Sequence, residues 1–220
     1  VLEPALGIFG VAVNVANIVI FARIGLNESI NVSFCALSVT DLLFLVCSGV
    51  INLFIAMGTY IPQAMVWVNM HALSGYLTWY RHILFDTSTC IHTYIAVARC
   101  CCVAMPLKFK NVFTVRRALV VFFIFLSANF ASHMPLLLSH GLTWVYNPKL
   151  NITQLNTWFY DEWTFYRRIN DIANRTIFPI VALLISIICA AILTRELIRA
   201  SKRREQMTRS STPYALTRSA

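Results

Sequence analysis

The sequence predicts an all-α transmembrane bundle of five membrane-spanning helices, and three observations support this fold class. Hydrophobic residues make up 58% of the chain and charged residues 12%, whereas soluble domains average about 25% charged residues. The mean hydropathy is +0.68. The apolar residues also form five runs, each long enough to cross a bilayer as a helix of about 20 residues. We therefore expect a lipid bilayer around the bundle.

The first two predicted helices, at 4–22 and 31–56, each carry an isolated polar residue within an apolar run. Asn14 lies in the first helix and Asp41 in the second. An ionised group in the middle of a membrane span is costly, so intramembrane acids usually face other helices and have a function. Asp41 is therefore a candidate functional residue.

The third predicted helix, at 72–104, carries a narrow line of polar side chains. At about 100° per residue, four of them fall on nearly one face of the helix. They are Arg81, Ser88, His92 and Arg99. The rise from the first to the last is roughly 27 Å, close to the hydrocarbon thickness of about 30 Å. We expect this polar seam to face other helices or water.

The last two predicted helices lie at 115–138 and 172–198, on either side of a polar segment, 139–175, that is rich in Trp and Tyr. Pro179 lies inside the fifth helix. The basic, Ser- and Thr-rich segment 196–220 has no further apolar run, and we expect it to be a disordered cytosolic loop or tail. The membrane bundle is therefore predicted to occupy 1–195.

Loop charges predict the orientation, because cytosolic loops of membrane proteins carry an excess of Lys and Arg. With the N-terminus outside, thirteen of the 18 basic residues fall in cytosolic segments and four in outer segments. This predicts a multi-pass plasma-membrane protein with an extracellular N-terminus. It also places the sequon at Asn151 outside, where it can be glycosylated.

Four sequence features occur in a fixed order along these helices. They are Gly10-Val-Ala-Val-Asn14, Leu37-Ser-Val-Thr-Asp41, Ala98-Arg99-Cys100 followed by Pro106-Leu107, and Pro179. With them the chain resembles the first five helices of a rhodopsin-like (class A) seven-helix G-protein-coupled receptor. The linker before the second helix looks most like the invertebrate chemosensory-type and neuropeptide-receptor-like branches. The resemblance implies an N-terminal fragment of a receptor that transduces an extracellular ligand to a heterotrimeric G protein.

Three departures from that family pattern bear on function. Ala98 stands where an acid usually pairs with the helix-three arginine, which puts basal silence in doubt. Ser74 stands near the position of an expected cysteine, and the second outer loop has no cysteine to pair with it. Asn129 lies near the usual tryptophan of helix four.

The resemblance assigns state coupling to a group of residues in the middle of the bundle. They are Asn14, Asp41, Ser88 and Pro179. It also implies a sodium ion at Asp41 and Ser88, because carboxylate and hydroxyl oxygens suit a hard cation. The alternative is a protonated or water-bonded acid without an ion. No other cofactor is expected.

The resemblance assigns G-protein coupling to Arg99, Pro106 and Leu107. Arginine suits this task because it stays charged and offers several hydrogen-bond donors. The alternative is a flanking positive charge that obeys the topology rule.

Arg81 lies five turns outward from Arg99, where the resemblance implies a ligand contact. A guanidinium favours an anionic or carboxylate-bearing ligand, so the ligand class is a peptide or an anionic small molecule. The other predicted ligand-binding residues are Phe85, Ser88 and Trp158. Arg81 can instead pair with Asp86 or extend to the interface. The aromatic residues of the outer loop can instead form an interfacial belt. Asp86, one turn from His82, is expected to be structural.

The sequence argues against catalysis and nucleic-acid binding. It has no nucleophile motif and no His/Cys spacing typical of zinc, and its basic residues lie between apolar spans. Two other classes stay open: a fragment of a secondary transporter or channel, with Asp41 and Arg81 on a permeation path, and a non-signalling truncated receptor that pairs with intact relatives. A receptor dimer is a further expected partner.

Overall fold

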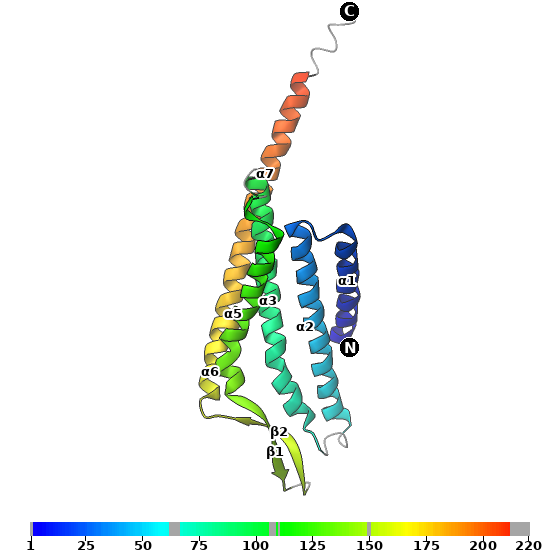
Figure 1. The fold of residues 1–220 in the computed structure, drawn as a ribbon, viewed down its shortest axis with the longest axis vertical. Helices are drawn as coiled ribbons and strands as arrows, with labels where there is room; N and C mark the ends of the chain where they lie inside the picture. Colours follow the sequence, from blue (N-terminus) through cyan, green and yellow to red (C-terminus); the bar gives the residue numbers. More distant parts are fainter. Residues whose placement is uncertain (1, 62–66, 106–108, 110, 149–150, 212–220) are drawn as a thin grey trace, which may run out of the picture.

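The computed structural model describes residues 2–61, 67–105, 109, 111–148 and 151–211, which form a bundle of long helices with a β-hairpin at one end (Figure 1). The elements in chain order are α1 Leu2–Ile24, α2 Ser29–Tyr60, α3 Met70–Ala104, α5 Val115–Leu138, β1 His140–Asn147, β2 Ile152–Phe159, α6 Trp163–Asn170, η2 Asp171–Ile177 and α7 Phe178–Ser211. The predicted all-α transmembrane bundle is confirmed. The hairpin was not predicted from the sequence.

Helix α3 lies at the centre of the bundle, where it contacts α2, α5 and α7. Helix α1 packs against α2 at the side of the bundle (Figure 1). The hairpin and the start of α3 lie at one end, which we call the hairpin end. The α1–α2 connection and the C-terminal part of α7 lie toward the other end. Helix α3 therefore links the hairpin end to the other end of the bundle.

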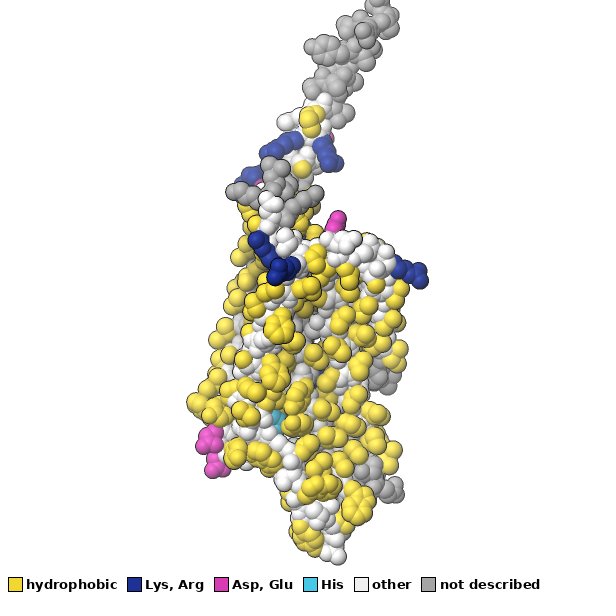
Figure 2. Space-filling view, in the orientation of Figure 1, with side chains coloured by type: hydrophobic (Ala, Val, Ile, Leu, Met, Phe, Trp, Pro, Cys, Tyr) yellow, Lys and Arg dark blue, Asp and Glu magenta, His cyan; other side chains and the backbone are white. Residues whose placement is uncertain are grey.

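The outer surface of the bundle is apolar, as a lipid-facing surface requires. Within the described residues, four segments are long and apolar enough to cross a membrane. They are Ala5–Ile24, Ser29–Tyr60, Val115–Leu138 and Trp163–Met207. At most 17% of the most apolar stretch of each is buried inside the protein, and Figure 2 shows apolar side chains along the length of the face in view. Helix α3, with 35 residues, is also long enough, but its polar residues lower its hydropathy.

A small apolar cluster packs α2, α3 and α5 together in the half of the bundle away from the hairpin. Its buried members, here called the inner cluster, are Val32, Ile91, Ile95, Ala118 and Phe122. Tyr94 packs its ring edge-on against Phe122, with the ring centroids 5.2 Å apart. Such an aromatic pair adds about 0.5–1.5 kcal/mol beyond the burial of apolar area. This cluster fixes the position of α3 relative to α2 and α5.

The hairpin pairs β1 and β2 in an antiparallel ladder, from His140–Phe159 at its base to Asn147–Ile152 near its turn. Leu155 of β2 also bonds to the segment before α3: its N–H donates to the Trp67 carbonyl, and its carbonyl accepts from the Asn69 N–H. The Asn69 side chain then caps α3 by accepting from two backbone N–H groups. The hairpin and the start of α3 therefore form one unit.

The segment from Trp163 to Ser211 is a continuous helix with one wide turn, η2, in which the backbone is π-helical. The π turn ends directly before Phe178 and Pro179. Because Pro179 has no N–H, it cannot donate to the carbonyl one turn earlier, and its ring crowds that carbonyl. A π turn at this point accommodates the proline inside a long helix.

Helix α7 continues to Ser211, whereas the sequence predicted disorder from residue 196. The residues of this extension, Arg195–Met207, are mostly Arg, Glu, Leu, Lys, Gln and Met, which favour helices. Arg199 also donates to Glu196 at 2.5 Å. Local propensity therefore extends the helix although no apolar face requires it. The predicted segment 212–220 lies outside the described residues.

Candidate functional site

A cavity of about 410 Å³ opens at the hairpin end of the bundle. Helix α3, both strands, α6 and η2 all contribute to its wall. The lining residues with titratable or aromatic side chains are His71, Tyr76, Trp79, His82, His140, Phe159, Trp163, Arg167, Asp171 and Arg175. Ligand pockets commonly have volumes of 300–1,000 Å³. The cavity therefore has the size and the mixed lining of a small-molecule site.

His140, the first residue of β1, is fixed among aromatic rings at the wall of this cavity. It is 4% exposed. Its Nδ1 lies 2.7 Å from the Leu136 carbonyl oxygen, so Nδ1 carries the proton and donates. The rings of Tyr76, Trp79 and Phe159 lie 5.5–6.3 Å from the His140 ring. These contacts leave Nε2 without a hydrogen-bond partner among the described residues.

Arg175 reaches the cavity from the π turn η2. Its guanidinium lies over the Phe85 ring, 5.9 Å from the centroid. Its Nε and one terminal nitrogen are buried and have no hydrogen-bond partner among the described residues. Arg167, one turn of helix before Asp171, pairs with that acid at 3.7 Å. The cavity wall therefore holds one compensated basic residue and one whose buried donors are unpaired.

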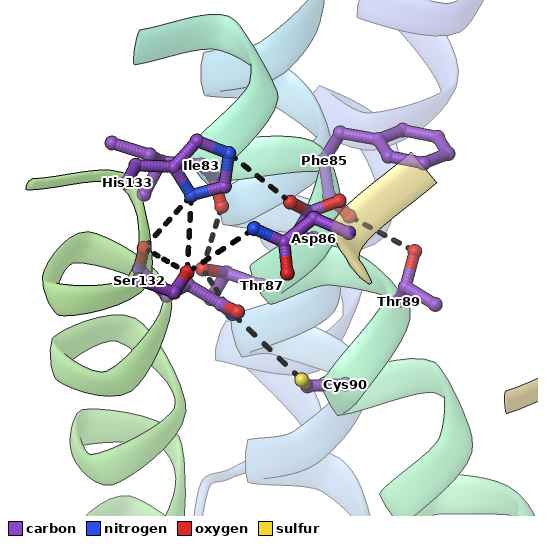
Figure 3. A network of polar contacts seen from close by, with 10 residues as sticks. Ile83, Phe85, Asp86, Thr87, Thr89, Cys90, Ser132 and His133 are labelled. Atoms are coloured by element: carbon purple, nitrogen blue, oxygen red, sulfur yellow. Dashed lines mark hydrogen bonds and ion pairs between the residues drawn. The ribbon is translucent and has the colours of Figure 1, made fainter. Parts of the chain in front are cut away.

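A buried acid–histidine pair lies beside Arg175, between α3 and α5. The Asp86 side chain is 1% exposed and the His133 side chain 0%, and His133 Nε2 lies 3.6 Å from Asp86 Oδ2. Figure 3 shows the two side chains directed toward each other. Arg175 also interacts electrostatically with Asp86. Sequence reasoning placed Asp86 one turn from His82 on its own helix, whereas the structure pairs it with another helix.

The hydrogen bonds of His133 show that this pair holds a proton. His133 Nδ1 lies 2.9 Å from the Asn129 carbonyl oxygen, so Nδ1 donates. In a neutral ring, Nε2 would then turn a lone pair toward the carboxylate. Two facing acceptors repel each other, so this arrangement favours a proton on His133 Nε2 or on the Asp86 carboxyl group. The pair is therefore a protonated acid beside a neutral ring, or an ion pair.

Asn129 supports the pair from one turn below His133 on α5. Its side-chain amide donates to the Thr87 hydroxyl at 3.2 Å and contacts the Cys90 sulfur at 3.8 Å. The amide therefore ties α5 to α3 directly beneath Asp86. Asn129 stands where the resemblance expected a tryptophan, and here a polar contact between the helices takes the place of an aromatic one.

Asp41 and Ser88 meet in the middle of the bundle, where the Ser88 hydroxyl donates to Asp41 Oδ1. Asn14, which also belongs to the predicted state-coupling group, does not join this contact. Its side-chain amide donates to the Gly10 carbonyl on its own helix at 3.0 Å. The structure therefore brings together the acid and hydroxyl of the predicted group across α2 and α3. Pro179 lies on α7, directly after η2.

A sodium ion at this place would require more oxygen ligands than these two residues supply. Hard cations take six or more oxygens, and the Ser88 hydroxyl already donates to Asp41. No group of three or more His, Cys, Asp or Glu residues is placed to hold a metal within the described ranges. The observed donor set does not by itself make a cation site, and sodium binding stays a prediction.

The sequence model of the serpentine-type 7TM GPCR chemoreceptor Srx matches residues 5–217, almost the whole chain. This chain belongs to the Srx family of chemoreceptors. No curated protein matches it. The family and the apolar helices establish a multi-pass membrane protein with a G-protein-coupled receptor role, and they confirm the predicted chemosensory class. Such a receptor family is generally non-enzymatic and has ligands and G proteins as general partners.

Arg81 of this Srx receptor lines a second, larger cavity of about 910 Å³, between α1 and α2. The other lining residues are mostly apolar: Leu6, Gly7, Ile8, Val11, Phe44, Leu45, Val46, Ser48, Gly49, Asn52 and Leu53. The polar seam of α3 therefore faces the α1–α2 side. The cavity at the hairpin end is lined by a different face of α3, which carries Trp79 and His82. The helical wheel showed which residues share a face, but it could not show which neighbour that face meets.

The other predicted ligand residues have different neighbours. Phe85 packs between Phe44, at 5.8 Å, and Arg175. Ser88 bonds to Asp41, as described above. Trp158 contacts Tyr160, with centroids 4.7 Å apart. Because strand side chains alternate, Trp158 points away from the cavity that Thr157 and Phe159 line.

Arg99 lies at the end of the Srx receptor opposite the hairpin. It is exposed, and its guanidinium lies 4.8 Å from the centroid of the Phe34 ring of α2. Its neighbour Ala98 is buried. The other two predicted G-protein residues, Pro106 and Leu107, lie outside the described residues.

The sequence did not indicate that the residues lining the cavity at the hairpin end lie together. His140 and Arg175 stand 35 residues apart and share no motif. The β-branched and aromatic residues in 142–147 (Thr, Trp, Val and Tyr) and in 152–158 (Ile, two Thr and Trp) are typical of strands. Recognising that hairpin would have placed His140 at its base, beside the end of α5.

Proposed function

We propose that this chain supplies the first five helices of a rhodopsin-like receptor at the plasma membrane, which transduces an extracellular ligand to a heterotrimeric G protein. The observation that carries the proposal is the cavity of about 410 Å³ at the hairpin end, whose wall includes α3. Its volume suits a small molecule better than a folded peptide. Of the two predicted ligand classes, the anionic small molecule is therefore favoured.

The distribution of basic side chains supports an orientation with the hairpin outside. Figure 2 shows Lys and Arg side chains gathered at the end opposite the hairpin. Cytosolic ends of membrane helices carry this excess. The same orientation makes Asn151 extracellular, and this exposed residue stands at the hairpin turn with φ +52°. Its glycosylation remains part of the proposal.

The proposed mechanism is a shift between helix arrangements. A ligand in the cavity would touch α3, the hairpin, α6 and η2 together, and α3 contacts α7 along the bundle. A ligand shifts an equilibrium only as far as its affinities for the two states differ. A preference of one state over the other by about 100-fold, or 2.7 kcal/mol, would move a 1:10 population to about 10:1.

Arg99 is placed to change partner at a small energetic cost. Its contact with Phe34 is exposed, and such cation–π contacts contribute about 0.5–1 kcal/mol. Because Ala98 cannot form an ion pair with it, we infer that Arg99 leaves Phe34 readily to meet the carbonyl groups of a G protein. The proposal therefore includes measurable signalling without ligand.

The test compares basal G-protein activation by the full-length receptor with that of Arg99→Ala in cells. We expect the variant to lose basal activation while its surface expression stays unchanged. Arg195→Ala is the matched control, because Arg195 is an exposed arginine of α7 and should leave activation intact. Equal activation by Arg99→Ala and the parent receptor would contradict this role.

The proposed state coupling depends on the contact between Asp41 and Ser88, because this hydrogen bond joins α2 to α3 midway between the cavity and Arg99. Asp41→Asn would keep the shape and remove the charge. We expect it to change the ratio of basal to maximal activation. A shift of ligand affinity with sodium that disappears in the same variant would support the predicted ion.

A further inference from the structure

Three side chains in the wall of the cavity at the hairpin end have buried hydrogen-bonding atoms without partners among the described residues. The atoms are the Nε and one terminal nitrogen of Arg175, the Nε2 of His140 and the Nε1 of Trp163. Buried polar atoms in native proteins are nearly always bonded, so each exception calls for an explanation. All three residues line the same cavity, where a bound molecule can supply the missing partners. Arg175 and His140 differ in charge and in hydrogen-bonding role.

Arg175 offers hydrogen-bond donors and a positive charge. The acid nearest to it in the cavity wall, Asp171, is already paired with Arg167 at 3.7 Å. The buried acid Asp86 interacts with Arg175 electrostatically, but its side chain faces His133, with Asp86 Oδ2 3.6 Å from His133 Nε2. The remaining titratable groups of the wall are His71, His82, His140 and Tyr76. A single negative charge is therefore the natural complement of Arg175.

His140 offers an acceptor in its neutral form. Its Nδ1 donates to the Leu136 carbonyl at 2.7 Å, which leaves the lone pair of Nε2 unused. Because the residue is 4% exposed, bulk water cannot readily serve as its donor. The natural complement of Nε2 is a hydroxyl group or an N–H group of a ligand.

The wall near these two side chains is aromatic. Tyr76 and Trp79 come from α3, Phe159 from β2 and Trp163 from the start of α6. The rings of Phe159 and Trp163 lie 4.6 Å apart. Aromatic rings stack on or pack edge-on against other flat rings, and each such pair adds about 0.5–1.5 kcal/mol. The natural complement of this wall is a flat apolar ring.

We propose that the cavity binds a small aromatic monocarboxylate that also carries a hydroxyl group. Its carboxylate accepts hydrogen bonds from Arg175, its hydroxyl donates to His140 Nε2, and its ring lies against the aromatic wall. A phosphate would carry up to two negative charges, whereas Arg175 compensates one, so a carboxylate fits better. The inference rests on the proposed receptor function and names the ligand class of that same site.

The test uses three related probes and the full-length receptor in lipid nanodiscs. The probes are 4-hydroxyphenylacetate, its neutral amide 4-hydroxyphenylacetamide, and phenylacetate, which lacks the hydroxyl group. The readout is the probe-dependent rise of the thermal unfolding midpoint, which gives an apparent affinity. We expect 4-hydroxyphenylacetate to bind best. The amide should bind about 10- to 100-fold more weakly, because it loses hydrogen bonds between charged groups.

Two variants assign these preferences to individual residues. Arg175→Gln should bind the acid and the amide equally, and His140→Phe should bind the hydroxylated and unhydroxylated acids equally. Arg168→Gln and His92→Phe are the matched controls, because both parent residues are exposed and lie outside the wall of the cavity. Both controls should keep the preferences of the parent receptor.

Each variant removes one preference and keeps the other, so a general loss of folding cannot imitate the expected pattern. Equal binding of acid and amide by the parent receptor would overturn the inference. Binding of none of the three probes would overturn it as well, and so would Arg175→Gln with the preference of the parent.

G-protein activation by the same receptor separates this inference from the proposed function. Activation by neutral or cationic compounds but not by the carboxylates would leave the receptor role intact and overturn the ligand class. Binding with the expected pattern of preferences, but without activation of any G protein, would support the ligand class and contradict the signalling role.

Discussion

The two halves of the bundle hold two different clusters of buried side chains, and α3 and α5 contribute to both. The half away from the hairpin holds the inner cluster of apolar residues between α2, α3 and α5. The half near the hairpin holds what we call the outer polar group: Asp86, His133, His140 and Arg175. Ile91 of the inner cluster follows Asp86 by little more than one turn of α3. One helix therefore passes from polar to apolar packing within a few ångströms.

This difference indicates that the two clusters have different roles, one in packing and one in function. The inner cluster contains no polar atom that needs a partner, so its contribution is burial and fit. The outer polar group contains several buried atoms without hydrogen bonds, and each such atom costs about 1–3 kcal/mol. Stability alone would not favour that arrangement. We infer that the outer half is shaped for a bound molecule and that the inner half holds the helices in place.

The largest expected effect comes from breaking the buried acid–histidine pair. His133→Leu leaves Asp86 without its partner, and the loss of one member of a buried pair costs about 3–5 kcal/mol. The free energy of unfolding, measured by titration with a denaturing detergent, should fall by this amount. In the double variant with Asp86→Leu, most of the loss should be recovered, because no uncompensated group remains. An additive loss in the double variant would contradict the pairing.

A loss of unfolding free energy of similar or smaller size is expected when a side chain of the inner cluster is shortened and leaves an empty space. Ile91 is 2% exposed, and Ile91→Ala should cost about 2–5 kcal/mol, against about 0.5–1.5 kcal/mol for Ile91→Val. The apparent affinity for 4-hydroxyphenylacetate in the thermal-shift assay should remain close to that of the parent receptor. An affinity that fell as strongly as in Arg175→Gln would show that the two halves are not separate.

A loss of about 1 kcal/mol is expected at the start of α3, where Asn69 caps the helix. Its side chain accepts from the N–H groups of His71 and Ala72 at 3.1 and 3.2 Å. It also donates to the Asn156 side chain of β2 at 3.3 Å. Asn69→Ala should therefore speed amide hydrogen exchange in the hairpin as well.

Thr114→Ala is the control for this variant, because Thr114 caps α5 at the opposite end by accepting from Arg117. It should weaken its own helix and leave exchange in the hairpin unchanged. Unchanged exchange in Asn69→Ala would show that the hairpin holds its position without this contact.

The smallest effect is expected in the extension of α7. The side chains of Arg199 and Glu196 are 48% and 30% exposed, and exposed pairs contribute about 0.2–1 kcal/mol, often less on helices. Glu196→Gln should shift the free energy of unfolding by less than about 0.5 kcal/mol. A cycle with Arg199→Gln measures the coupling directly, and a coupling above 1 kcal/mol would show that solvent screens this pair poorly.

The helices were predictable because a bilayer leaves few alternatives. Backbone groups in lipid must bond within the segment, so a long apolar run becomes a helix. The contact between Asp41 and Ser88 was expected from the family resemblance, which made these two residues neighbours. The hairpin was missed because its strands lie outside the apolar spans, and its aromatic residues also suit an interfacial belt.

The outer polar group was beyond sequence reasoning for a geometric reason. Asp86 and His133 lie on different helices, 47 residues apart, and their meeting depends on how α3 and α5 are rotated about their axes. The helical wheel placed Asp86 away from the seam of Arg81 and Arg99. The sequence does not show that this second face of α3 meets a histidine on α5.

The wide turn η2 has a consequence for comparing this chain with its relatives. A π turn holds one residue more than an α-helical turn, and each residue of an α-helix advances by about 100°. A relative with one residue fewer between Asp171 and Ile177 would keep α7 in phase but rotate α6 by that angle. Trp163 and Arg167 would then point away from the cavity that they line here. A one-residue gap at this place in an alignment would therefore mark a relative whose cavity has different side chains in its wall.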